Sequence, residues 1–158
     1  MAELKWSNSA QVKFPPDAVY AWMTDFQEDD HGRPAFIKGS GAPAKVYKKP
    51  SKRTIVSRSG NNVKILDVWG GRTYDMDLEL VPLDRTIIMK SQWNYHAVWK
   101  AVPHEGGTKV EAEVDMKVGG FAGLVMGLFK KKFYRDLSYD FNGHISDLQD
   151  SLGAPREG

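Results

Sequence analysis

The segment Lys109-Val110-Glu111-Ala112-Glu113-Val114-Asp115-Met116-Lys117-Val118 alternates charged and apolar side chains without interruption. Because successive side chains of a β-strand point to opposite faces of a sheet, this segment predicts a strand with one buried and one solvated face. Turn-like joins such as His104-Glu105-Gly106-Gly107 separate it from similar segments, so we expect antiparallel neighbours. The strands predicted in this part of the chain are at about 45–49, 53–59, 62–69, 72–82, 86–102 and 108–118.

Helical patterns flank these strands. Alternating apolar positions predict another strand at 4–14, which Pro15-Pro16-Asp17 ends before a helix at 16–26. Residues 27–45 are polar and contain several glycines and prolines, so we expect a short helix and loops there at best. A long helix is predicted from Lys130 to Leu152, because one apolar stripe recurs at helical spacing. That stripe consists of Phe133, Leu137, Phe141, His144, Ile145, Leu148 and Leu152.

Composition narrows the classes of function. The 158 residues suit one domain, over 1–158 with a tail at 153–158 that we expect to be disordered. With 22 basic and 20 acidic residues the net charge is +2, too balanced for a nucleic-acid binder, so nucleic acid is not an expected partner. The chain has no cysteine, and its start shows no apolar signal region. No stretch reaches the roughly 18 apolar residues of a membrane span, so we expect a cytoplasmic protein.

The side-chain parity of the strands predicts an aromatic inner face. In 86–102, alternation places the aromatic side chains on one side and the polar ones on the other. In 72–82, Tyr74 and Met76 share the apolar side. In 62–69, an exposed Lys64 would turn Asp67 and Trp69 inward, although a bulge could reverse this.

The order of elements resembles a known superfamily. Local similarities are Phe14-Pro15-Pro16-Asp17-Ala18-Val19-Tyr20-Ala21-Trp22 with Asp25 after it, Gly106-Gly107-Thr108-Lys109-Val110-Glu111, and the terminal helix. The chain resembles the helix-grip or SRPBCC superfamily, which includes START lipid-transfer domains, the birch pollen allergen family and polyketide cyclase/dehydrase-like proteins. The resemblance implies an α+β fold, with a curved antiparallel sheet wrapped around the long C-terminal helix. It also implies a deep hydrophobic cavity for small apolar or amphipathic ligands, but no invariant catalytic residues.

We therefore expect the protein to bind or transport a hydrophobic or amphipathic small molecule, such as a lipid, isoprenoid or polyketide-like compound. Asp67, Tyr74 and Lys130 would orient it. Ordinary core packing is the alternative for the aromatic residues, since large rings dominate many cores. The expected ligand-binding residues are Trp69, Met76, Trp93, Tyr95, Trp99, Val114, Met116, Met126, Lys130, Phe133 and Tyr134.

An enzyme of the cyclase or dehydratase type is the second hypothesis. Asp67 would act as the acid–base group, and Tyr74 or Tyr95 would donate a hydrogen bond to a substrate carbonyl. The structural alternative, which we favour, either pairs Asp67 with an arginine or lysine or places it on the outer face through a register shift. His144 is expected to be a core histidine rather than a catalyst, so no catalytic residue is assigned.

We expect neither a metal nor a cofactor. Asp29-Asp30-His31 is the only tight group of metal-ligand types, and a solvated acidic segment is its better interpretation. Nothing in the sequence resembles a Rieske-type or other cofactor signature.

The segment from Gly119 to Phe129 is apolar throughout and is followed by Lys130-Lys131-Lys132. It either continues the terminal helix or is separated from it by a break near residue 129. If exposed, residues 119–132 would contact a membrane surface or a partner protein, or form a lid. The third hypothesis is therefore an interaction module that uses 119–129. A short buried helix with a solvated basic turn is the simpler alternative, and we favour it because eleven residues are too few to be diagnostic.

Overall fold

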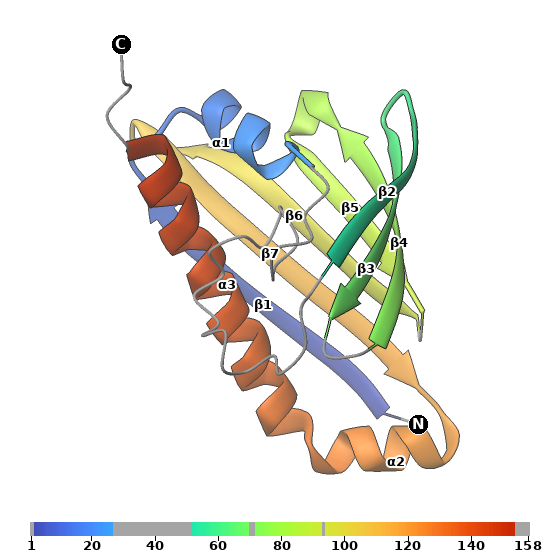
Figure 1. Ribbon diagram of the computed structural model, residues 1–158. Helices are drawn as coiled ribbons and strands as arrows, with labels where there is room; N and C mark the ends of the chain where they lie inside the picture. Colours follow the sequence, from blue (N-terminus) through green and yellow to red (C-terminus); the bar gives the residue numbers. More distant parts are fainter. Residues whose placement is uncertain (1, 27–51, 70–71, 93, 154–158) are drawn as a thin grey trace.

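The described residues form one antiparallel sheet and three α-helices in a computed structural model covering 2–26, 52–69, 72–92 and 94–153 (Figure 1). The strands are β1 (Ala2–Val12), β2 (Lys52–Ser59), β3 (Asn62–Trp69), β4 (Arg72–Val81), β5 (Thr86–Ser91), β6 (Tyr95–His104) and β7 (Gly107–Val118). The helices are α1 (Pro16–Met23), α2 (Gly120–Leu128) and α3 (Lys130–Gly153), with a 3-10 turn η2 at Pro82–Asp84. Strand order is β1-β7-β6-β5-β4-β3-β2, so the expected α+β fold is confirmed.

The first and last strands of the sequence pair along their whole length. Partners run from Ala2 opposite Val118 to Val12 opposite Thr108. Gly107 starts β7 at the end of this ladder, where a Cβ would lie 2.3 Å from the carbonyl oxygen of Val12. Only glycine permits so close an approach of two backbones, which fixes this residue type at the join.

Tight hairpins join β2 to β3 and β6 to β7, as the turn signals predicted. Glu105 and Gly106 both have positive φ, at 47° and 80°, as a type I′ turn between β6 and β7 requires. Gly60 has φ 58° between β2 and β3. Connections this short leave the two strands of each hairpin antiparallel.

The strand predicted at 86–102 is wrong as a single element, because β5 ends at Ser91 and β6 begins at Tyr95. Asn94 has φ 56°, and the backbone N–H of Tyr95 donates to the carbonyl of Gln92 across the turn. The side-chain amide of Gln92 contacts β4 beyond the last residue pair of the β4–β5 ladder, because its Nε2 donates to the carbonyl of Thr73 at 2.9 Å. The strand predicted at 45–49 and the elements predicted at 27–45 lie outside the described residues.

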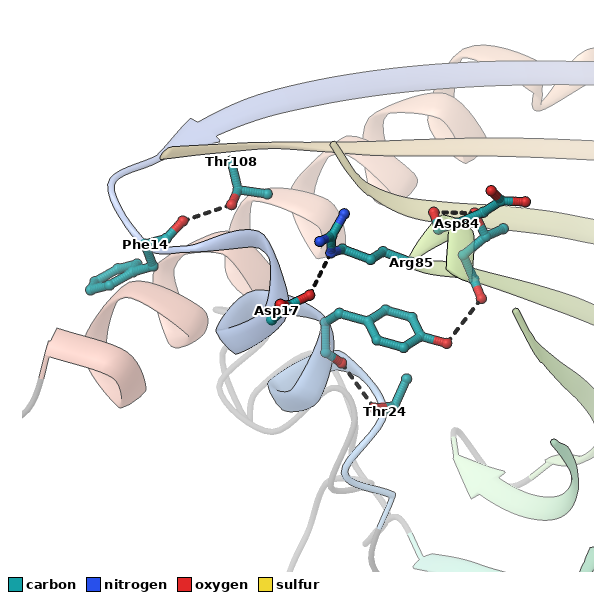
Figure 2. Close-up of polar contacts among 8 residues, drawn as sticks. Phe14, Asp17, Thr24, Asp84, Arg85 and Thr108 are labelled. Carbon is teal, nitrogen blue, oxygen red and sulfur yellow. Dashed lines mark hydrogen bonds and ion pairs between the residues drawn. The ribbon is translucent and has the colours of Figure 1, made fainter. Parts of the chain in front are cut away.

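Helix α1 covers one end of the inner face of the sheet, which is the face packed against α1 and α3. It ends at Met23 and not at 26, because Thr24 leaves helical geometry with φ −101° and ψ 2°. Figure 2 shows two contacts that hold this region: Asp17 accepts a hydrogen bond from Arg85 at 2.7 Å, and Thr108 donates to the carbonyl of Phe14 at 2.6 Å.

The hydroxyl of Tyr20 gives α1 another link to the sheet. It donates to the backbone carbonyl of Thr86 at 3.3 Å. Burial raises the pKa of Tyr20 above its ordinary value, because desolvation disfavours the phenolate. The hydroxyl therefore keeps the proton that this hydrogen bond needs.

Helix α3 lies along the edge strand β1 (Figure 1). Its predicted stripe faces the protein: Phe141, His144 and Leu148 are buried, and the other stripe residues are half-buried. Two hydrogen bonds join it to β1, from the indole Nε1 of Trp6 to Ser138 Oγ at 3.0 Å, and from the backbone N–H of Lys5 to the hydroxyl of Tyr134 at 3.1 Å. The helix extends to Gly153, so the tail expected at 153–158 begins with a helical residue and otherwise lies outside the described residues.

We predict that Gly107→Ala destabilises the fold, since the new Cβ collides with the backbone of β1. The free energy of unfolding should fall by about 1–3 kcal/mol, the usual cost of overpacking. Gly119→Ala is a matched control, because nothing lies within 4 Å of a Cβ there and its φ of −99° suits alanine. Urea denaturation of both variants measures the difference. Equal stabilities would contradict the close approach of β1 and β7.

Candidate functional site

Three polar side chains lie in one row on the inner face of the sheet. The strand registers place Arg53 opposite Asp67, and Asp67 opposite Tyr74. Directly opposed residues of antiparallel strands project to the same face with Cβ atoms roughly 5 Å apart. The next row contains Ile65 opposite Met76, so apolar side chains adjoin the polar row.

Arg53 and Asp67 form a buried bidentate ion pair. Nε of Arg53 donates to Oδ1 of Asp67 at 2.8 Å, and Nη2 donates to Oδ2 at 2.8 Å. Each residue is 2% exposed, and the guanidinium lies over the ring of Phe26, with Cζ 5.8 Å from the ring centroid. The predicted inward orientation of Asp67 is confirmed, and so is the structural alternative in which it pairs with a basic residue. Both carboxylate oxygens accept charge-assisted hydrogen bonds from Arg53. This arrangement favours a structural role for Asp67 over that of a general base.

Two of the expected ligand-binding residues, Trp99 and Val114, lie in the main core. The Trp99 ring centroid is 5.4 Å from that of Phe141 and 5.3 Å from that of His144. Core packing thus describes Trp99, and burial of His144 fits the expected core histidine. Their contact with a ligand stays a prediction.

A second, smaller cluster gathers five more of the expected residues at the end of the sheet near α2. Its buried members are Leu4, Met116 and Val118. The half-buried side chains packed on them are Tyr95, Met126, Phe133 and Tyr134. The structure therefore brings together residues of β6, β7, α2 and α3 that the sequence analysis placed in one ligand site, although the buried Leu4 was not among them.

Three large inner-face side chains of β4 and β6 keep part of their surface exposed. Tyr74, Met76 and Tyr95 project from the inner face and are each only half-buried. At the other end, Val19, Met23 and Phe141 are at most 2% exposed. We therefore take the part of the inner face near β3, β4 and the start of β6, which carries these three side chains, as the candidate ligand site.

Lys130 lies at the margin of this site. It is exposed, with Nζ 5.7 Å from the centroid of the Tyr134 ring. An ammonium over an aromatic face is a favourable contact. Because Lys130 is exposed outside the cluster, its ammonium group can contact a charged group at the surface but not one enclosed within the cluster.

The short buried helix favoured for 119–129 is wrong. Of the two alternatives for the start of the terminal helix, the structure contains the break, at Phe129 with φ −104° and ψ 17°, but only Gly123 of α2 is buried. Phe121, Leu124, Leu128 and Phe129 are all exposed. Because of the break, the exposed apolar side chains of α2 do not continue the stripe by which α3 packs on the sheet.

Some of the expected residues have no described side chain. Trp93 and Asp29-Asp30-His31 lie outside the described residues, and Trp69 is described only as the last residue of β3. Within the described ranges, no three histidine, aspartate or glutamate side chains gather closely enough to hold a metal ion.

The sequence analysis missed Arg53, the partner of Asp67 in the buried ion pair. Arg53 begins the strand predicted at 53–59 and is two residues from Ile55, so period-two parity places both on one face. That signal was present but was masked by the bulge between Ile55 and Ser57, beyond which the alternation of β2 shifts.

Comparison with known proteins gives matches of structure only. No family model and no curated protein matches the sequence. The structure is similar to the Zhui aromatase/cyclase from Streptomyces sp. R1128, with TM-score 0.69 and 14% identity over 96% of this chain and 97% of that one. A START superfamily protein from Mycobacterium smegmatis has TM-score 0.58 and 13% identity, covering 91% and 98%. Ara h 8.0201 has TM-score 0.57 and 10% identity, covering 94% and 99%.

The chain has the helix-grip fold, with a curved antiparallel sheet and a long C-terminal helix. The resemblance to the SRPBCC superfamily inferred from the order of elements is confirmed as a likeness of fold. Fold alone does not assign an activity, because function depends on the residues of the site.

We predict that Asp67→Ala lowers the free energy of unfolding by about 3–5 kcal/mol, because it leaves the buried Arg53 without its counter-charge. The double variant Arg53→Met/Asp67→Leu should recover most of this loss, since no charge then remains buried. Chemical denaturation measures both.

Asp77→Ala is the control for this prediction. Asp77 pairs with Lys64 at 3.8 Å on the exposed face, and its removal should cost less than about 1 kcal/mol. If Asp67→Ala costs no more than Asp77→Ala, the pair is not the buried interaction described here.

Proposed function

We propose that the protein binds a hydrophobic or amphipathic small molecule, of the lipid, isoprenoid or polyketide-like class, between the inner face of the sheet and α3. The observation that carries this proposal is the partial exposure of Tyr74, Met76 and Tyr95, three large side chains that project from the inner face of the sheet. An apolar ligand in contact with these side chains would remove their remaining surface from water. Burial of apolar surface contributes roughly 25 cal/mol per Å².

The chemistry of the site suits a molecule with one polar end. Met76, Met116 and Met126 supply pliable apolar surface that adapts to ligand shape. Tyr74 adjoins the Arg53–Asp67 row, where its hydroxyl can meet a carbonyl or hydroxyl of the ligand. Such sites typically combine an apolar wall with a few polar groups that fix orientation.

Similarity of fold gives the proposal coarse support. Among the structural neighbours, one is an aromatase/cyclase and one is a START superfamily protein. The superfamily resemblance adds the expectation that a small molecule lies in a cavity between the sheet and the helix.

A cyclase or dehydratase reaction through Asp67 and Tyr74 is the alternative. The bidentate pair with Arg53 weighs against it, since proton transfer at Asp67 would disrupt two charge-assisted hydrogen bonds. We therefore favour binding without covalent chemistry. Tyr74→Phe distinguishes the two, because a binding protein should retain its ligand whereas a cyclase should lose turnover.

The proposal predicts that the purified protein carries a stoichiometric apolar adduct in native mass spectrometry. Denaturing extraction then identifies the class of the adduct. An empty protein that also fails to bind fatty acids, isoprenoids and polyketides would contradict the proposal.

Met76→Trp should weaken binding about tenfold, because overpacking the site by about 1.4 kcal/mol corresponds to one decade in affinity. Val56→Trp is the matched control, since Val56 is 59% exposed on β2 and the added ring lies in solvent. Titration with the extracted ligand, or with a fluorescent fatty acid, measures both variants. Equal loss of affinity in both would place the ligand elsewhere.

A further inference from the structure

The outer face of α2 exposes three large apolar side chains. Phe121 is 81% exposed, Leu124 64% and Leu128 77%. The spacing of these residues, i, i+3 and i+7, places them on one side of the helix. Figure 1 shows α2 at one end of the molecule, near the N-terminus, and turned away from the axis of α3.

The inner face of the same helix is packed. Gly123 is buried, and Met126 packs on the cluster formed by Leu4, Met116 and Val118. Helix α2 is therefore held on β1 and β7 by one side. The helix is therefore apolar on both its packed side and its solvent-facing side. Exposure of the solvent-facing side to water is unfavourable unless another surface covers it.

The segment that follows this helix is positively charged. Lys130, Lys131 and Lys132 begin α3, one residue after the end of α2, and are all exposed. From residue 118 to 134 the sequence contains these three lysines and no acidic residue. The carboxylate of Glu3, on the neighbouring end of β1, forms an ion pair with Lys5 at 3.3 Å, so its charge is balanced within β1.

These two features together favour a lipid surface over a second copy of the chain. A two-fold contact centred on α2 would offer these lysines no counter-charge from the same segment, because residues 118–134 of the second copy contain no acidic residue. An anionic bilayer satisfies both features at once, because its headgroups attract lysines and its interfacial region accepts Phe and Leu side chains.

We propose that α2 and Lys130–Lys132 form a docking surface for an anionic phospholipid bilayer. Phe121, Leu124 and Leu128 enter the boundary between headgroups and acyl chains, and the lysines contact lipid phosphates and carboxylates. The nine residues of α2 lie in the interface, and within the described ranges no helix is long and apolar enough to cross a membrane. This docking does not require the ligand proposed above, so each proposal can fail alone.

Vesicle co-sedimentation tests the docking surface. The full chain should bind vesicles of equal parts phosphatidylcholine and phosphatidylserine, and should bind phosphatidylcholine vesicles more weakly. Leu124→Ser/Leu128→Ser should lower affinity for the anionic vesicles roughly tenfold or more, through lost apolar insertion. Lys131→Gln/Lys132→Gln should also lower it about tenfold, and added salt should reduce wild-type binding.

Matched controls keep the test specific. Leu83→Ser removes a 96% exposed leucine from η2, and Lys90→Gln/Lys100→Gln removes two exposed lysines from β5 and β6. Both controls should bind vesicles as the wild type does, and thermal melts should show that all variants fold.

Three results would overturn the proposal. One is absence of vesicle binding at low salt, and another is equal binding by the α2 variants and the controls. The third is failure on vesicles combined with self-association, or with binding to an acidic protein, that Leu124→Ser/Leu128→Ser abolishes.

Discussion

The contact of Phe141 with two tryptophans fixes the position of the long helix, and the remaining architecture follows from it. Phe141 is 1% exposed, and its ring centroid lies 5.9 Å from that of Trp6 on β1 and 5.4 Å from that of Trp99 on β6. These strands flank β7, so one side chain anchors α3 across three strands of the sheet. Aromatic side chains bury large areas, and their edge-to-face contacts add stabilisation beyond that area. Hydrogen bonds from β1 to Ser138 and Tyr134 then align the helix with the edge strand.

This anchoring divides the inner face into two halves with different chemistry. Near α1, Val12, Val19, Met23 and Phe141 are buried in the main core. Near β3 and β4, the inner face combines half-buried Tyr74 and Met76 with the buried Arg53–Asp67 pair. Replacing such a pair by apolar residues is often neutral or stabilising, so stability alone does not explain its presence in the interior. A row of polar groups beside an apolar wall suits an amphipathic ligand.

Much of this arrangement could be predicted from the sequence, because the period of a strand is two and one residue sets the orientation of the rest. Parity correctly turned Asp67, Trp99 and Val114 inward. Parity could not reveal the turn between β5 and β6. In their register, odd-numbered residues of one strand lie opposite odd-numbered residues of the other, such as Met89 opposite Ala97, so the same parity faces inward in both. Alternation therefore passes through the turn unchanged. Arg53 was missed for a related reason: ion-pair partners follow from register and bulge position, and both depend on tertiary pairing.

The segment from Gly119 to Phe129 shows why composition alone misjudged exposure. An apolar helix is buried on both sides only if two surfaces cover it, and the sheet supplies one. The break at Phe129 directs Met126 onto the cluster that also contains Tyr95 and Phe133, while Leu124 and Leu128 point outward. Helix α2 consequently lies between the cluster of Leu4, Met116 and Val118 and the solvent. A bilayer on its outer side, as proposed, would therefore lie one helix away from a cluster that also contains Tyr95, the side chain that this cluster shares with the proposed ligand site.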